Sequence, residues 1–109
     1  MPVREIAPVV LQEQLNGKGE RPVLLDVRTP QEHALVALPN SALIPLQEFG
    51  ERLAELDALK GKPVVVYCHT GVRSFHAAAF LASRGVDAAS LAGGIERYSL
   101  EVDPSLPRY

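Results

Sequence analysis

The run Val64-Val65-Val66-Tyr67 constrains the fold of this chain more than any other segment. All four side chains are apolar, so a strand formed here would bury both of its faces. Such a strand is typical of the centre of a parallel sheet. Gly61-Lys62-Pro63 stands directly before the run and marks the turn that leads into it. The run therefore predicts the core strand of an α/β domain.

Short β-rich runs alternate with segments of helical period along the rest of the chain. After a short start at residues 3–6, strands are predicted at 23–27, 43–44, 64–67 and 88–91, and helices over 8–16, 47–59, 73–84 and 95–100. In the helix over 73–84, Ala77, Phe80 and Leu81 have the spacing of a buried face. This alternation predicts one α/β domain over 1–109, with a mainly parallel sheet of about five short strands and helices on both faces. Residues 103–109 are expected to form an extended tail that is only partly fixed.

The composition excludes several classes of protein. With 47% hydrophobic and 22% charged residues, the chain has the balance of an ordinary globular domain. A net charge of -2 offers no basic surface to nucleic acid or to an anionic membrane. The longest apolar run, Ala77–Ala82, is far shorter than the ~18 residues that a membrane span needs. The first residues also lack the pattern of a secretory signal, so we expect a cytoplasmic protein with a small-molecule partner.

Cys68, the single cysteine, comes directly after the predicted central strand. In parallel sheets, ligands bind beyond the carboxyl ends of the strands. From Cys68 to Ser74 the chain runs from strand into helix. Free backbone N–H groups and the positive end of the helix are therefore expected to converge near the sulfur. None of residues 69–74 is proline, and Gly71 permits the turn that such an anion cradle needs.

The cradle predicts a chemical role for this cysteine. The N–H groups, the helix dipole and the charge of Arg73 all favour a thiolate at Cys68, which would then be a nucleophile. We therefore predict that Cys68 is the catalytic residue. The predicted substrate-binding loop contains His69, Thr70, Gly71, Val72, Arg73 and Ser74.

Several of these residues also have simpler interpretations. A lone cysteine after a strand is often a small buried hydrophobic residue, although the glycine, arginine and helix that follow favour a functional one. His69 is a base beside the thiol, a wall that steers substrate, or a loop residue that faces solvent. Asp26, Arg28 and Glu32 follow another predicted strand, where they would form an ion pair or helix cap, or line the cleft. One cysteine and three separated histidines predict no metal site.

Three motifs in order resemble the rhodanese-like family of single-domain sulfurtransferases, and the resemblance covers nearly the whole chain. The motifs are Leu25-Asp26-Val27-Arg28 followed by Glu32, then Cys68 with Gly71, Arg73 and Ser74, then Leu91 with Gly93, Gly94 and Ile95. The chain departs from the family pattern over Val36–Ser41 and at Tyr98, where a tryptophan is common.

The resemblance implies a rhodanese-like fold and a persulfide relay. In such a relay, Cys68 takes a sulfane sulfur from a donor such as thiosulfate or a protein persulfide and passes it to a thiol or to cyanide. No metal or organic cofactor is implied. The lack of a second cysteine fits this chemistry, because an internal resolving thiol would divert the persulfide into a disulfide.

Two alternative functions stay open. Phosphatases and arsenate reductases of the C-x5-R type also hold a thiolate in an N–H cradle. In this chain only four residues separate Cys68 from Arg73, which predicts a tighter ring, better sized for one sulfur than for a tetrahedral oxyanion. The other alternative is a non-catalytic rhodanese-like module that binds a partner or regulates. Degenerate modules of that kind typically lose the cysteine, which this chain retains.

Overall fold

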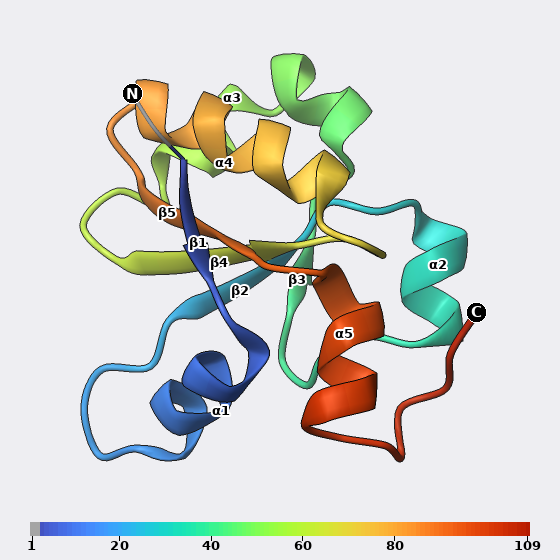
Figure 1. The fold of residues 1–109 in the computed structure, drawn as a ribbon. Helices are drawn as coiled ribbons and strands as arrows, with labels where there is room; N and C mark the ends of the chain where they lie inside the picture. The colour runs from blue at the N-terminus through green and yellow to red at the C-terminus, as the bar shows by residue number, and fades with distance from the viewer. Residues whose placement is uncertain (1–2) are drawn as a thin grey trace.

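A five-stranded, all-parallel sheet forms the centre of the computed structural model, which describes residues 3–109 (Figure 1). The strands are β1 (Arg4–Ile6), β2 (Val23–Asp26), β3 (Ala42–Leu43), β4 (Pro63–Tyr67) and β5 (Asp87–Leu91). The helices are α1 (Pro8–Asn16), α2 (Pro30–Leu35), the 3-10 helix η1 (Leu46–Glu51), α3 (Leu53–Asp57), α4 (Val72–Ser83) and α5 (Gly94–Glu101). The strand order is β1-β5-β4-β2-β3, and the predicted α/β fold is confirmed.

Strand β4 occupies the middle of the sheet, as its apolar sequence predicts. It pairs with β2 on one side and with β5 on the other. Val64 and Val66 contribute to one hydrophobic core, whereas Val65 and Tyr67 contribute to a second. Because successive side chains of a strand point to opposite faces, each face of the sheet has its own core.

Helices cover both faces of the sheet. Helices η1, α3 and α4 pack over one face, and α1 and α5 over the other (Figure 1). The first layer buries Phe49, Leu56 and Leu81, and the second buries Leu11 and Ile95. The carboxyl end of β4 and the first turns of α2, α4 and α5 thereby meet at one edge of the sheet.

The single helix predicted over 47–59 is wrong, because the segment divides into η1 and α3. The division falls at Arg52, whose backbone has φ -125° and ψ 34°. Gly50 is a poor helix former and weakens the first half of the segment. The interruption still leaves Phe49 and Leu56 buried in the same core.

The predicted inward position of Phe80 is also wrong. Ala77 and Leu81 on the same helix are fully buried, but Phe80 is 38% exposed. The two smaller residues occupy the face of α4 that packs on the sheet, which leaves Phe80 at the border of the core. There its ring lies 5.9 Å from the ring of Phe49.

The last residues of the chain return from the end of α5 toward α2 (Figure 1). The Ser99 hydroxyl donates to the carbonyl oxygen of Leu106 at 2.8 Å. The Arg108 guanidinium donates two hydrogen bonds, of 2.9 and 3.0 Å, to the Glu96 carboxylate. The tail that we expected to be only partly fixed is therefore held against α5.

Candidate active site

Residues 68–74, here called the cysteine loop, join β4 to α4 at the carboxyl edge of the sheet. Gly71 precedes the helix with φ +105°, a conformation that residues with a side chain rarely adopt. This turn places the first residues of α4 against the Cys68 side chain. Cys68 is only 1% exposed and also belongs to one of the two hydrophobic cores.

Two backbone N–H groups donate hydrogen bonds to the Cys68 sulfur. They belong to Gly71 and Ser74, with N···S distances of 3.1 and 3.3 Å. The sulfur also lies 3.4 Å from the Ser74 hydroxyl, which is 2.8 Å from the hydroxyl of Ser90 on β5. Sequence reasoning did not identify Ser90, whose position behind the sulfur depends on the pairing of β4 with β5. Hydrogen-bond donors around a sulfur favour its negatively charged form, so these surroundings suit a thiolate.

Other N–H groups of the cysteine loop are free to bind a ligand. Within residues 3–109, no hydrogen-bond acceptor is found for the backbone N–H groups of His69, Thr70, Val72 and Arg73. They stand at or before the first turn of α4, where the helix dipole also favours negative charge. The loop thus offers two N–H groups to the sulfur and four more to an anion bound beside it.

The first turn of α5 supports the cysteine loop through its backbone. The N–H groups of Ile95 and Glu96 donate to the carbonyl oxygens of Cys68 and His69, at 2.9 and 3.0 Å. Gly94 permits this close approach, because a Cβ there would lie 2.7 Å from the Cys68 oxygen and nearer still to that of His69. The third sequence motif therefore holds the backbone of the loop in place.

Arg73 is paired with Glu32 in the structure. Its two terminal nitrogens donate to the two carboxylate oxygens at 2.7 and 2.9 Å. We expected the charge of Arg73 to act on the sulfur, but the carboxylate neutralises much of that charge. The backbone N–H groups of Gly71 and Ser74 and the dipole of α4 also favour negative charge at the sulfur.

Glu32 also caps α2, which agrees with the expected helix cap, although no helix was predicted over residues 30–35. The Thr29 hydroxyl accepts from the Glu32 N–H, and the Glu32 carboxylate accepts from the Thr29 N–H, both at 3.2 Å. The four residues Thr29-Pro30-Gln31-Glu32 contain the capping-box pattern, so a local signal for this helix was present. Cap and ion pair together connect α2 to the cysteine loop.

The Glu32 pairing predicts a pH dependence of stability. The Arg73 guanidinium holds the pKa of the Glu32 carboxyl well below its ordinary value of 4.5, and the hydrogen bonds from Tyr109 and Thr29 add to this effect. The lowered pKa means that Glu32 stabilises the fold above about pH 4.5, and that this contribution is lost as the pH falls further. We expect the difference in unfolding free energy between wild type and Glu32→Gln to be greatest near neutrality and to shrink at lower pH. Urea unfolding across that range measures it, and a pH-independent difference would contradict the ionic role.

Asp26 and Arg28 form an ion pair that is completely buried. Two Arg28 nitrogens donate to the Asp26 carboxylate at 2.8 and 2.7 Å, and one of them also donates to the Val36 carbonyl at 2.6 Å. The ring nitrogen Nδ1 of His33 lies 2.8 Å from the same carboxylate, a contact that sequence reasoning missed. Within residues 3–109, no hydrogen bond joins Asp26 or Arg28 to the cysteine loop. This geometry favours the ion-pair interpretation of these two residues over a place in the cleft.

Tyr109 reaches the cysteine loop from the far end of the sequence. Its ring stacks on the ring of His69, with centroids 4.0 Å apart and planes 15° apart. Its hydroxyl donates to Glu32 at 2.6 Å and accepts from Arg28 at 2.9 Å. No local pattern marks a single tyrosine in a tail as part of a site, so the sequence held no signal for it.

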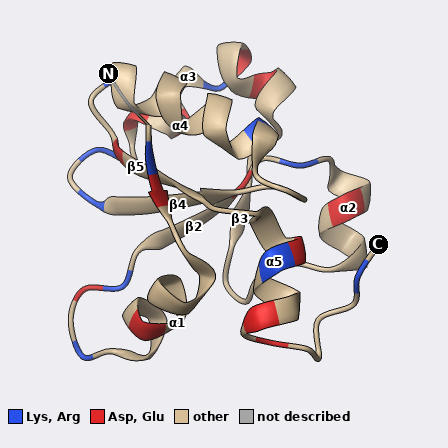
Figure 2. Cartoon of the chain, viewed as in Figure 1, with Lys and Arg blue, Asp and Glu red and all other residues tan. Residues whose placement is uncertain are grey.

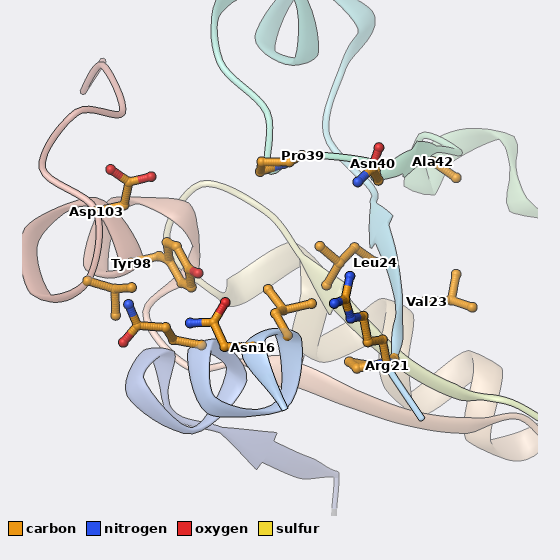
Figure 3. Close-up of a pocket in the computed structure, with 13 residues that line it drawn as sticks. Asn16, Arg21, Val23, Leu24, Pro39, Asn40, Ala42, Tyr98 and Asp103 are labelled. Atoms are coloured by element: carbon orange, nitrogen blue, oxygen red, sulfur yellow. The ribbon is translucent and has the colours of Figure 1, made fainter. Parts of the chain in front are cut away.

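A cavity of about 590 Å³ opens elsewhere on the molecule, between α1, α5 and the segment that leads to β3 (Figure 3). Polar residues at its border include Asn16, Arg21 and Asn40, and no part of the cysteine loop lines it. Tyr98, which departs from the family pattern, also lines this cavity.

Basic and acidic residues are interspersed along the described part of the chain (Figure 2). Across residues 3–109, no helix has both the length and the apolar character needed to cross a membrane. In the same residues, no three side chains of histidine, cysteine, aspartate or glutamate gather into a group that could hold a metal ion.

Comparisons with known proteins agree with the observed fold. Residues 8–101 match the model of the rhodanese-like domain family. A protein named sulfurtransferase from Allochromatium vinosum is 35% identical over 94 residues, which cover 85% of each chain. Rhodanese-like/PpiC domain-containing protein 12 of Arabidopsis thaliana is 36% identical over 115 residues, which cover 97% of this chain. This chain spans only 38% of the length of that Arabidopsis protein.

A solved structure shows the same architecture. The rhodanese-like domain protein of Staphylococcus aureus matches with a TM-score of 0.82 and 27% identity, over 98% of this chain and 99% of that one. The family match covers most of the sequence and includes all three motifs. Because sequence match, sheet topology and cysteine loop agree, this chain belongs to the rhodanese-like domain family.

Proposed function

We propose that this protein is a sulfurtransferase that carries sulfur as a persulfide on Cys68. The observation that carries the proposal is the pair of N–H donors, from Gly71 and Ser74, on the single buried cysteine sulfur. A thiolate in that position is a nucleophile toward a sulfane sulfur. The family and its sulfurtransferase relatives support the same reaction class.

The proposed reaction has two displacement steps. In the first, the Cys68 thiolate attacks the outer sulfur of thiosulfate, a new S–S bond forms, and the thiosulfate S–S bond breaks. Sulfite leaves with the bonding electron pair, and the protein holds Cys68-S-S⁻. In the second step, a thiolate or cyanide attacks the outer sulfur, and the Cys68 thiolate leaves. A protein persulfide would serve as donor by the same displacement.

The free N–H groups of the cysteine loop suit the intermediate of this reaction. A persulfide carries its charge on the outer sulfur, one bond beyond the thiolate position. The unpaired N–H groups of residues 69, 70, 72 and 73 would stabilise charge there, and they would do so without rearrangement. The short spacing from Cys68 to Arg73 favours the single outer sulfur of a persulfide over a tetrahedral oxyanion.

Loading of one sulfur atom onto the purified protein tests the proposal. After incubation with thiosulfate and removal of the excess, intact-mass spectrometry should show a gain of one sulfur. Peptide mapping should place it on Cys68. Cyanide should then remove the sulfur and release thiocyanate in equal amount, because the second displacement regenerates the thiolate.

Other outcomes of the same experiment identify the alternatives. A protein that accepts sulfur neither from thiosulfate nor from an organic persulfide would be a binding or regulatory module. A protein that hydrolyses an aryl phosphate faster than it transfers sulfur would be a phosphatase. Iodoacetamide-blocked protein is the matched control, since alkylated Cys68 cannot accept sulfur by displacement.

A further inference from the structure

Residues 106–109, here called the strap, cross from α5 to the cysteine loop. The strap is held at its first residue by the hydrogen bond from Ser99 to Leu106, whose side chain packs against the second core. Arg108 then pairs with Glu96 on the first turn of α5. These contacts direct Tyr109 onto the loop beside the cysteine.

Tyr109 covers one side of the cysteine loop. Its ring stacks on His69, the residue next to Cys68, with ring centroids 4.0 Å apart. Beneath this cover the His69 nitrogen Nε2 is shielded from solvent and has no hydrogen-bond partner within residues 3–109. An unpaired buried polar atom is unfavourable, so this nitrogen would gain a partner if the ring moved aside.

The hydroxyl of Tyr109 connects the strap to a second part of the site. It donates to the Glu32 carboxylate at 2.6 Å, and the same carboxylate pairs with Arg73 of the cysteine loop. It also accepts from Arg28 at 2.9 Å. Tyr109 therefore touches the loop directly at His69 and indirectly, through Glu32, at Arg73.

We propose that Tyr109 determines which sulfur acceptors reach Cys68, admitting small acceptors freely and requiring bulky thiols to displace the strap. The proposal rests on the function proposed above. Cys68 is almost completely buried, so an attacking thiol must pass the residues that surround the loop. A cyanide ion is small enough to enter beside Tyr109, whereas a cysteine within a polypeptide brings its neighbouring residues against the ring.

The contacts of the strap are suited to displacement. The Arg108–Glu96 pair is largely exposed on the arginine side, and ion pairs of that kind contribute little to stability. Tyr109 itself is 40% exposed, so a partner can approach one side of it while it is still bound. A polypeptide acceptor could then replace the stacking on His69 and provide a partner for its free nitrogen.

Single-turnover transfer from protein loaded with persulfide tests the proposal. The acceptors are cyanide and a long unstructured peptide with one cysteine, and the proteins are wild type, Tyr109→Ala and Tyr109→Phe. We expect Tyr109→Ala to accelerate transfer to the peptide by roughly two- to tenfold, the range that loss of an aromatic contact produces. Transfer to cyanide should stay within about twofold of wild type, since a small ion does not need the strap to move.

Tyr109→Phe is the matched control, because it keeps the ring and removes the hydrogen bonds to Glu32 and Arg28. If stacking on His69 is the selective contact, its ratio of peptide to cyanide rates should stay near that of wild type. An unchanged ratio in Tyr109→Ala overturns the proposal. An equal fall for both acceptors also overturns it, since Tyr109 would then only position Arg73 through Glu32.

Alkylation of Cys68 gives a second readout that does not require sulfur transfer. The rates with iodoacetamide and with a maleimide bearing a polyethylene glycol chain are compared in the same three proteins. Tyr109→Ala should raise the alkylation rate with the bulky maleimide more than the rate with iodoacetamide. An unchanged ratio of the two rates would contradict the role of the strap. If no persulfide forms but this selectivity changes, the proposed function fails while the control of access by Tyr109 stands.

Discussion

Replacement of Cys68 by alanine is expected to abolish sulfur transfer from thiosulfate to cyanide, with kcat/KM lowered by more than about a thousandfold. The variant has no atom on which the transferred sulfur could be held, and the chain contains no other cysteine. Thiocyanate production under steady-state conditions measures the effect. Intact-mass spectrometry of the same variant after thiosulfate should show no added sulfur.

The fold of Cys68→Ala must be checked because the side chain is buried in a core. The loss of one small group should lower stability only modestly, so urea unfolding should remain cooperative. His76→Ala is a matched control, because His76 is exposed on α4, outside the cysteine loop. It should retain the wild-type rate. A folded Cys68→Ala variant with a tenth or more of wild-type activity would show that another group carries the sulfur.

Replacement of Asp26 by alanine is expected to destabilise the protein by about 3–5 kcal/mol, the cost of leaving one member of a buried ion pair without its partner. Arg28 would keep its charge in a position that is 0% exposed. The lost carboxylate would also remove the acceptor beside His33. Since a domain of this size is stable by only about 5–15 kcal/mol, a large part of the protein should unfold at modest urea concentration.

Two further variants identify the cause of that loss. The double variant Asp26→Leu with Arg28→Met removes both charges and should recover much of the stability, because an apolar pair needs no partner. Asp87→Ala breaks the exposed pair with Arg4 and should have a small effect. Equal destabilisation by Asp26→Ala and Asp87→Ala would contradict the argument from burial. Failure of the double variant to recover any stability would do so as well.

The sequence alone predicted the α/β architecture and the place of Cys68 at the end of the central strand. Val64–Tyr67 could be placed at the centre because a strand buried on both faces needs apolar residues at every position. Cys68 could be placed at the carboxyl edge because it follows that strand directly. Gly71 indicated the turn into α4 through its own backbone preference. These inferences concern residues that are adjacent in the chain, where local rules apply.

Helical spacing of apolar residues was a less reliable guide where glycine or tertiary packing acts against it. The apolar spacing over 47–59 fits a single helix, yet Gly50 weakens that helix and the segment divides at Arg52. Phe80 has helical spacing with Ala77 and Leu81, but the width of the buried face of α4 is set by the sheet against which it packs. Periodicity predicts which residues share a face, and only packing decides where that face ends.

The surroundings of the cysteine were decided by the tertiary structure. Arg73 pairs with Glu32, Ser74 contacts Ser90, and Tyr109 stacks on His69. Each of these pairs joins residues that are far apart in sequence, and each depends on strand order or on the path of the strap. Turn preferences and hydrophobic periodicity act over a few residues, so they predict the cysteine loop itself. The partners of that loop are set by which strands lie side by side and by where α2, α5 and the strap pack. A pattern of a few residues does not predict such long-range contacts.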